Sequence, residues 1–117
     1  MKVTAIVPNL RVDSTDATRD FLIEFLGLRM GFDHRGVVNL RSRENPLAQV
    51  QLSQDDGPAI SIHVPDAREA YEEAKFRDYD IAYPLTHEPD GRVRFFVRAP
   101  GGMLINIIEH DDSAHLP

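Results

Sequence analysis

Two stretches of the chain repeat the same order of apolar and polar positions. The first opens with an apolar run over residues 3–12 and the second with an alternating run over 59–64, and each is followed by a two-residue polar stop and an amphipathic stretch. The runs end at Val12 and Val64, which sets an offset of 52 residues, 64 less 12. A repeat of this kind predicts two similar structural modules in one chain.

The first amphipathic stretch predicts a helix that begins after Ser14 and ends at Gly27. Its apolar residues recur at helical spacing, with two more beside them: Ala17, Phe21 and Phe25, then Leu22 and Leu26. A serine N-cap accepts a hydrogen bond from a free backbone N–H of the first turn. A glycine after the last turn can adopt the left-handed conformation that ends a helix.

The second amphipathic stretch predicts a helix that begins at Asp66, with Glu69 completing the capping pattern. Its expected buried stripe consists of small residues and one aromatic: Ala67, Ala70, Tyr71 and Ala74. Asp78 follows the last turn, and aspartate tolerates a positive φ better than most residues. We therefore expect the chain to leave this helix at Asp78.

The remaining segments alternate as strands do, and each is bounded by Gly, Pro, Asn or Asp: 28–34, 36–41, 47–53, 81–84, 92–98 and 103–109. Each half of the chain is then β-α-β-β-β. We place the first module at 2–54 and the second at 58–110 within a single domain. The polar tail, 111–117, is expected to be loose.

Composition and charge narrow the function classes. The 117 residues are 42% hydrophobic and include no cysteine, which excludes thiolate catalysis, disulfides and zinc fingers. The formal net charge is −6 and no basic block occurs, so we do not expect nucleic acid as a partner. No apolar run approaches the roughly 20 residues that a membrane span needs, so we expect no membrane partner either. An acidic surface favours cationic ligands weakly. We expect a cytoplasmic location.

Three segments of the sequence are similar to one known family: 6–12 continuing through 21–28, then 60–66, and then 84–105 with its closing hairpin. They resemble the vicinal oxygen chelate superfamily, which includes glyoxalase I, extradiol dioxygenases, fosfomycin resistance enzymes and bleomycin resistance proteins. The resemblance implies an α+β fold of two tandem β-α-β-β-β modules, whose mixed sheets curl into a cup around a ligand site, often completed by a partner subunit. Ala99 and Met103 depart from the usual closing turn, where that family carries Asp and Asn.

The resemblance also identifies four metal positions, occupied in metal-dependent members by a His in the first strand and a Glu in the last strand of each module. The corresponding residues here are Val7, Gln51 (or Gln49), Ala59 and Asn106. Neither an imidazole nor a carboxylate is present among them, and neutral amides are poor ligands for divalent ions. We therefore expect no metal and no other cofactor.

Strand alternation predicts which side chains line the ligand site: Val7, Asn9, Gln49, Gln51, Ser61, His63, Arg94, Phe96 and Asn106. Arg94 has two interpretations. Inward, it requires a carboxylate or an anionic ligand group; outward, it joins a solvated arginine ladder with Phe95 and Val97 in the core. His63 is either a ligand contact or an ordinary histidine at a strand end.

The function that these residues favour is metal-free binding of a small organic molecule in a homodimer. The Val7-Pro8 pair is similar to the opening strand of the bleomycin resistance branch, which implies sequestration of a cationic or aromatic, antibiotic-like ligand. The alternative is an enzyme: a glyoxalase-like lyase or isomerase, or a dioxygenase type, with a non-standard or absent metal site. A third hypothesis is an assembly module whose interior is filled by its own side chains.

Overall fold

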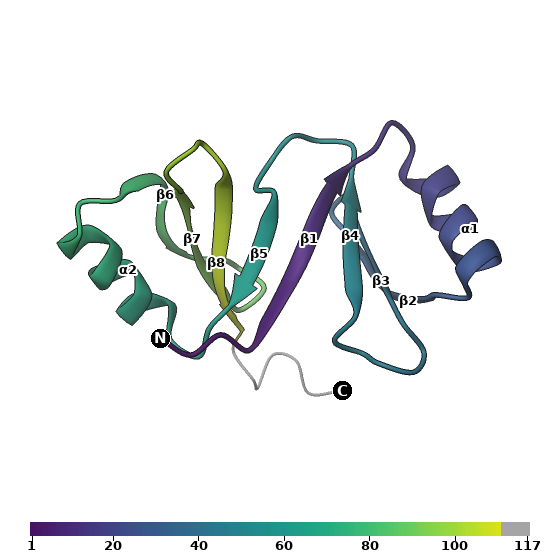
Figure 1. The fold of residues 1–117 in the computed structure, drawn as a ribbon, viewed down its shortest axis with the longest axis horizontal. Coiled ribbons are helices and arrows are strands. Elements are labelled where there is room, and N and C mark those ends of the chain that lie inside the picture. Colours follow the sequence, from purple (N-terminus) through teal and green to yellow (C-terminus); the bar gives the residue numbers. More distant parts are fainter. Residues whose placement is uncertain (111–117) are drawn as a thin grey trace. The chain divides into compact units, whose positions relative to one another are not determined.

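The computed structural model describes residues 1–110, and the tail predicted over 111–117 lies outside them. The elements follow in chain order (Figure 1): β1 (Ala5–Arg11), α1 (Thr15–Leu26), β2 (Arg29–His34), β3 (Val37–Arg41), β4 (Gln49–Ser53), β5 (Ile60–His63), α2 (Ala67–Phe76), β6 (Asp80–His87), β7 (Arg92–Arg98) and β8 (Leu104–His110). The predicted α+β order, β-α-β-β-β repeated twice, is confirmed. Neither helix in residues 1–110 is long and apolar enough to cross a membrane.

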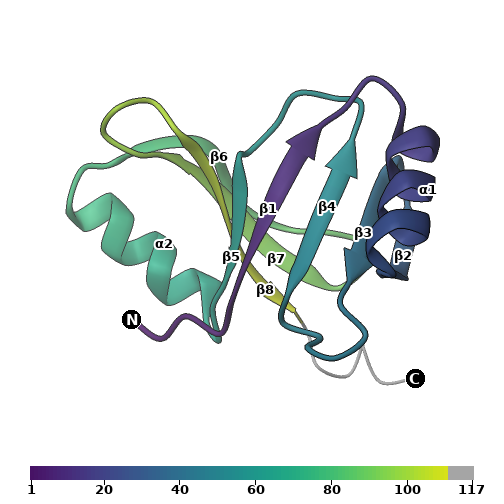
Figure 2. The same cartoon turned by 45° about the vertical axis from the view of Figure 1, so that its right-hand side comes forward.

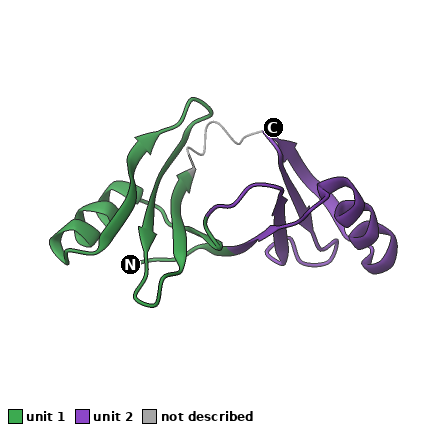
Figure 3. Cartoon of the chain, turned by 90° about the horizontal axis from the view of Figure 1, so that it is seen from above, with its two compact units in different colours: residues 1–6, 58–117 green, residues 7–57 purple. Residues whose placement is uncertain are grey.

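The chain divides into two compact units (Figure 3). Among the described residues, the N-terminal unit comprises 7–57, and the C-terminal unit comprises 1–6 together with 58–110. The first residues belong with the C-terminal unit because the Thr4 backbone N–H donates to the carbonyl oxygen of His63 at 2.9 Å. Strand β1 therefore begins in one unit and continues into the other.

The sheet of the N-terminal unit has the strand order β2-β3-β4-β1, with β1 and β4 parallel and the other pairs antiparallel. Helix α1 packs against β3 and β4 (Figure 2). The fully buried core on this side consists of Val38, Leu40 and Leu52, against which Leu22 and Ile23 of α1 pack. Helix α1 thus covers one face of this sheet.

The caps of α1 are those that the sequence predicts. The Ser14 Oγ accepts a hydrogen bond from the Ala17 N–H at 3.0 Å, and Gly27 adopts φ 70°. Of the residues predicted to be buried in α1, only Leu22 packs against the core, and the rest of the prediction is wrong because Ala17, Phe21, Phe25 and Leu26 are exposed. Phe21 and Phe25 are 59% and 72% exposed, with ring centroids 5.4 Å apart. A second stripe at helical spacing lies against the sheet instead, and all its members are half-buried: Thr15, Thr18, Arg19, Leu22 and Ile23.

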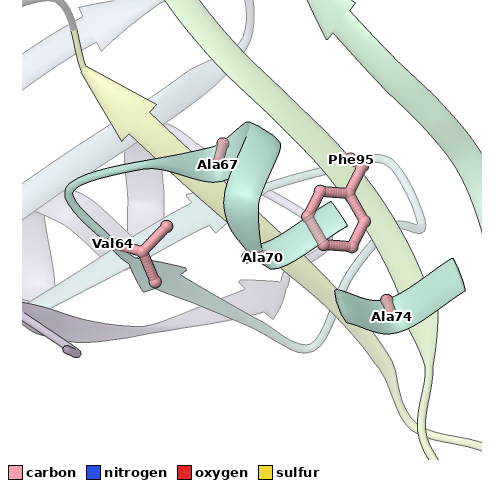
Figure 4. Close-up of a cluster of buried hydrophobic side chains, with 5 residues drawn as sticks. All are labelled: Val64, Ala67, Ala70, Ala74 and Phe95. Carbon is pink, nitrogen blue, oxygen red and sulfur yellow. The ribbon is translucent and has the colours of Figure 1, made fainter. Parts of the chain in front are cut away.

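The C-terminal unit has the strand order β5-β8-β7-β6, with β5 and β8 parallel and the other pairs antiparallel. The predicted alanine stripe of α2 is buried, and its small side chains let the helix approach the sheet closely enough to enclose Phe95, which is 1% exposed (Figure 4). Tyr71 packs edge-on against the Phe95 ring, with centroids 5.1 Å apart. The caps also match the prediction, because the Asp66 Oδ1 accepts from the Glu69 N–H and Asp78 has φ 58°.

Strand β6 is longer than the predicted segment 81–84. Proline was expected to end it, because proline has no N–H to donate. In the structure Pro84 lies within β6, an edge strand of its sheet, where the register shifts between Tyr83 and Thr86. Edge strands and bulges are where a sheet accommodates proline, so the strand continues to His87.

The core of the C-terminal unit predicts a large difference between two phenylalanines. Phe95→Ala is expected to lower the free energy of unfolding by about 3–5 kcal/mol, because it leaves a cavity under α2. The matched control is Phe76→Ala at the C-terminal end of α2, which is 87% exposed and for which we expect a change within about 0.5 kcal/mol. Urea denaturation measures both. An equal loss for the two variants would show that burial beneath α2 does not determine the contribution of Phe95.

Candidate functional site

In the N-terminal unit, polar side chains occupy the sheet face opposite α1. Successive side chains of a strand point to opposite faces, so the burial of Val38 and Leu40 under α1 directs Asn39 to the other face. The register places Asn9, Gln51 and Asn39 side by side across β1, β4 and β3. Val7, two residues before Asn9, is buried.

Hydrogen bonds join these polar side chains into a network. The Gln51 Nε2 donates to the Asn9 Oδ1 at 2.7 Å, the Asn39 Nδ2 donates to the Gln49 Oε1 at 2.9 Å, and the Arg41 Nε donates to the Asn39 Oδ1 at 2.8 Å. Asn39 is 0% exposed, and a buried amide is stable only when its polar atoms are paired. The predicted residues Asn9, Gln49 and Gln51 therefore lie together on this face.

Asn39 and Arg41 are the members of the network that the sequence analysis missed. The signal was present in the segment Val37–Arg41, which alternates apolar and polar side chains. The predicted lining residues come from β1, β4, β5, β7 and β8, and none of them comes from β3. Alternation applied to every strand would have placed both residues on this face.

Gly31 allows the network to form. It lies where the pairing of β2 with β3 shifts register, between Met30 and Phe32. A Cβ at this position would clash with the Asn39 Oδ1 and would approach the Arg41 Nε to 2.9 Å. The absence of a side chain at Gly31 therefore leaves the space that the Asn39 amide occupies.

This contact predicts the effect of adding a single methyl group. Gly31→Ala is expected to lower the free energy of unfolding by about 1–3 kcal/mol, because the Asn39 amide must move and lose a buried hydrogen bond. Gly57→Ala is the matched control, since nothing lies within 4 Å of its added Cβ. Thermal unfolding of the two variants compares them. Equal stability of both would mean that the network tolerates displacement of Asn39.

A second polar face lies in the C-terminal unit, opposite α2. Because Phe95 is buried under α2, alternation directs Arg94 and Phe96 to the other face. The register places Ser61, Asn106 and Phe96 side by side across β5, β8 and β7. The Asn106 Nδ2 donates to the Ser61 Oγ at 3.1 Å, and the two residues are 6% and 3% exposed.

Arg94 lies among aromatic rings and beside a carboxylate. Its Nη2 is 3.3 Å from the Glu88 Oε2, and the Tyr83 hydroxyl donates to the Glu88 Oε1 at 3.0 Å. The guanidinium carbon is 5.1 Å from the Phe96 ring centroid and 5.7 Å from that of Tyr83. This is the arrangement that an inward Arg94 requires: a half-buried cation with a carboxylate partner.

Tyr83 and Glu88 are further residues that the sequence analysis missed. Both belong to the segment around β6, which was expected to end at Pro84. The rings of Tyr83 and Phe96 lie with their centroids 4.8 Å apart, so they form one aromatic surface next to Arg94. Recognising that an edge strand can continue past proline would have brought Glu88 near β7.

Two buried polar atoms on this face have no hydrogen-bond partner among residues 1–110: the Arg94 Nε and the Asn106 Oδ1. Buried polar atoms are nearly always paired, and an unpaired one costs free energy. His63 is half-buried in the same sheet, with Ile108 as its partner in the register. The face therefore combines an aromatic surface with one donor and one acceptor that the described protein leaves unused.

The side chains at the metal positions do not form a set that suits a divalent ion. Gln51 lies in register with Asn9, and Asn106 with Ser61, two residues after the positions Val7 and Ala59 that the resemblance indicated. All four side chains in these two pairs are neutral amides or a hydroxyl. Within residues 1–110 no three His, Asp or Glu side chains are grouped so as to hold a metal ion.

A concave surface lies elsewhere in the C-terminal unit, on the side of the sheet that carries α2. It encloses about 1140 Å³ and is lined by residues of the helix, the chain start and the adjoining strands, among them Met1, Glu73, Phe76, Tyr79, Val97 and Ile107. None of the predicted ligand-binding residues lines it.

No protein-family model and no curated protein matches the sequence. Solved structures do. A glyoxalase/bleomycin resistance protein/dioxygenase superfamily member from Vibrio splendidus 12B01 aligns with a TM-score of 0.70 at 18% identity, covering 92% of this chain and 99% of that one. The Mn(II)-bound glyoxalase from Novosphingobium aromaticivorans aligns with a TM-score of 0.61 at 15% identity, over 92% of this chain and 38% of that one.

A third structure, named as an NAD-dependent benzaldehyde dehydrogenase from Legionella pneumophila, aligns with a TM-score of 0.71 at 13% identity, over 91% of this chain and 99% of that one. Similarity at these identities establishes the fold. The names attached to the three structures differ in chemistry, as expected for a fold that carries many functions. The predicted resemblance to the vicinal oxygen chelate superfamily is thus confirmed in the fold: this chain has the architecture of the glyoxalase/bleomycin resistance proteins.

Proposed function

We propose that the protein binds a small organic molecule, without a metal ion, on the polar sheet face of its C-terminal unit. The observation that carries the proposal is the pair of buried atoms, the Asn106 Oδ1 and the Arg94 Nε, that lack hydrogen-bond partners within residues 1–110. A ligand that pairs them removes the free-energy cost of leaving them unpaired. Binding sites are characteristically apolar surfaces with a few convergent polar groups of this kind.

The contacts on this face define the chemistry of the ligand. The Asn106 Oδ1 requires an N–H or O–H donor, and the Arg94 Nε requires an acceptor such as a carbonyl oxygen. The adjacent rings of Tyr83 and Phe96 favour a planar, unsaturated group. Glu88 already balances the charge of Arg94, so this face suits an uncharged polar aromatic group better than a cation.

Binding without turnover is the activity that these contacts support. Glu88 is the carboxylate nearest the free donor, and its two oxygens are held by Arg94 and by the Tyr83 hydroxyl. A general base must be able to reach the proton that it removes. Glu88 is held as an ion-pair partner, which leaves it poorly placed for that role.

Indole-3-carboxamide, which offers N–H donors, a carbonyl acceptor and a planar ring, is expected to bind this face. Phe96→Ala should weaken its affinity about tenfold, because the aromatic contact is lost. Phe76→Ala is the control, since Phe76 lies in the same unit and is 87% exposed. Calorimetric titration gives the affinities, and bleomycin serves as the cationic probe. Equal affinity of both variants would place binding elsewhere.

The metal-free part of the proposal has its own test. The protein stripped with a chelator is expected to show no stoichiometric binding of Ni²⁺, Mn²⁺, Fe²⁺ or Zn²⁺ in calorimetry, because the metal positions carry two aliphatic side chains, Val7 and Ala59, and two neutral amides. Stoichiometric binding that Gln51→Ala or Asn106→Ala abolishes would contradict the proposal. That result would favour the alternative of a glyoxalase-like lyase, isomerase or dioxygenase-type enzyme.

The homodimer also remains a proposal. Its support is the exposed aromatic stripe of α1, where Phe21 and Phe25 stack on one another with no other described aromatic ring against them. Large apolar side chains that cluster on a surface commonly mark an interface.

A further inference from the structure

Arg41 differs from the other half-buried arginines because it has no carboxylate partner among the described residues. Four arginines in residues 1–110 are half-buried: Arg19, Arg41, Arg92 and Arg94. Three have a carboxylate oxygen within 3.3 Å: Asp20 at 2.9 Å from Arg19, Asp90 at 2.9 Å from Arg92, and Glu88 at 3.3 Å from Arg94. No described carboxylate pairs with Arg41. A half-buried guanidinium normally requires a negatively charged partner.

The surroundings hold the Arg41 guanidinium in place without neutralising it. Its Nε donates to the Asn39 Oδ1 at 2.8 Å, and Asn39 is itself fully buried and donates to Gln49. This hydrogen bond uses the inner nitrogen of the guanidinium. The two terminal nitrogens donate to no residue that the structure describes, so they are available to a planar anion.

A second arginine lies directly beside Arg41. In the pairing of β2 with β3, Arg29 is the cross-strand partner of Arg41. Directly opposed residues have their Cβ atoms about 4.5–5.5 Å apart, and like charges in this arrangement repel. Arg29 has no carboxylate partner among residues 1–110 either. The electrostatic repulsion between two adjacent cations without a counter-charge decreases when an anion binds between them.

We infer that Arg41 and Arg29 bind an oxyanion, the carboxylate or phosphate group of a small organic molecule, on the sheet face of the N-terminal unit opposite α1. The guanidinium fork matches both groups, because each offers two oxygens in one plane to two parallel N–H donors. The inference goes beyond the proposed function, since it concerns other residues, the other unit, and a negatively charged rather than an uncharged ligand group. The net charge of −6 does not oppose it, because solvent ions screen distant charges and leave the nearest pair dominant.

Three probes that share a phenyl ring test the inference: benzoate, phenyl phosphate and uncharged benzamide. We expect one or both anions to shift the NMR signal of the Arg41 Nε–H, with an affinity that falls as salt is added, whereas benzamide leaves this signal unchanged, even where it binds the C-terminal unit. A shift with benzoate alone identifies a carboxylate site, and a shift with phenyl phosphate alone a phosphate site. Failure of both anions to shift the signal, or an equal shift with benzamide, would overturn the inference.

Substitutions localise the effect. Arg41→Gln is expected to weaken anion binding about tenfold or more, and the exposed Arg29→Gln about threefold. Arg68→Gln in α2 changes the net charge equally and should leave the affinity unchanged. Because the Arg29 side chain makes no hydrogen bond or ion pair within residues 1–110, its variant tests the inference even if Arg41→Gln fails to fold. Equal affinity for the Arg29 and Arg68 variants would exclude the arginine pair as the site.

Indole-3-carboxamide separates this inference from the proposed function. If its binding depends on Phe96 while the anions depend on Arg41, both stand. If the anions fail and the carboxamide binds, the anion site alone is excluded.

Discussion

The packing of one buried row of side chains under each helix determines where every candidate ligand contact points. In the C-terminal unit, Phe95 fits beneath the alanines of α2. Because successive side chains of a strand point to opposite faces, its neighbours Arg94 and Phe96 point to the face away from α2. Leu40 has the same role in the N-terminal unit, and it directs Asn39 and Arg41 away from α1. The polar faces are therefore by-products of two small apolar cores.

The two modules use equivalent positions in equivalent ways. Asn9 and Ser61 are separated by the repeat offset, and each lies in register with an amide of the parallel strand beside it, Gln51 and Asn106. A hydrogen bond of 2.7 Å joins the first pair and one of 3.1 Å the second. Gln51 and Asn106, two of the four positions at which the resemblance implies metal ligands, thus each donate a hydrogen bond to a side chain of the neighbouring strand. Beyond these pairs the two sheets differ: within residues 1–110, one carries arginines without a carboxylate partner and the other carries adjacent aromatic rings.

Features that depend on local chemistry were predictable. Ser14 and Asp66 have side chains that pair with the first turn of a helix, and Gly27 and Asp78 tolerate a positive φ, so both helix starts and both exits followed from single residues. The stripe of α1 was not predictable in the same way. Phe21 and Phe25 form the more apolar stripe, but the choice between two stripes depends on which fits the sheet. The pattern within the helix carries no information about that fit.

In the candidate site, too, some residues were predictable from the local sequence pattern and others depended on contacts between distant segments. Alternation placed Gln49, Gln51 and Phe96 on faces where the structure also has them. It could not supply Glu88, because a loop residue has no period and reaches Arg94 only through the path of the chain after β6. Nor could it reveal Gly31 as the residue that admits the Asn39 amide. Both depend on contacts between strands, which sequence spacing does not specify.

The unequal attachment of the two helices has a consequence for the dynamics of the molecule. Helix α2 has three fully buried alanines, whereas α1 has no fully buried residue. The free energy of local opening rises with the apolar surface that must be exposed. Detachment of α1 is therefore expected to cost less free energy than detachment of α2, so that the backbone amides of α1 exchange with solvent faster. Such opening would uncover Leu40 and Leu52. We therefore expect the susceptibility of this unit to proteases and to aggregation to depend on how firmly its helix is attached more than on the pairing of its strands.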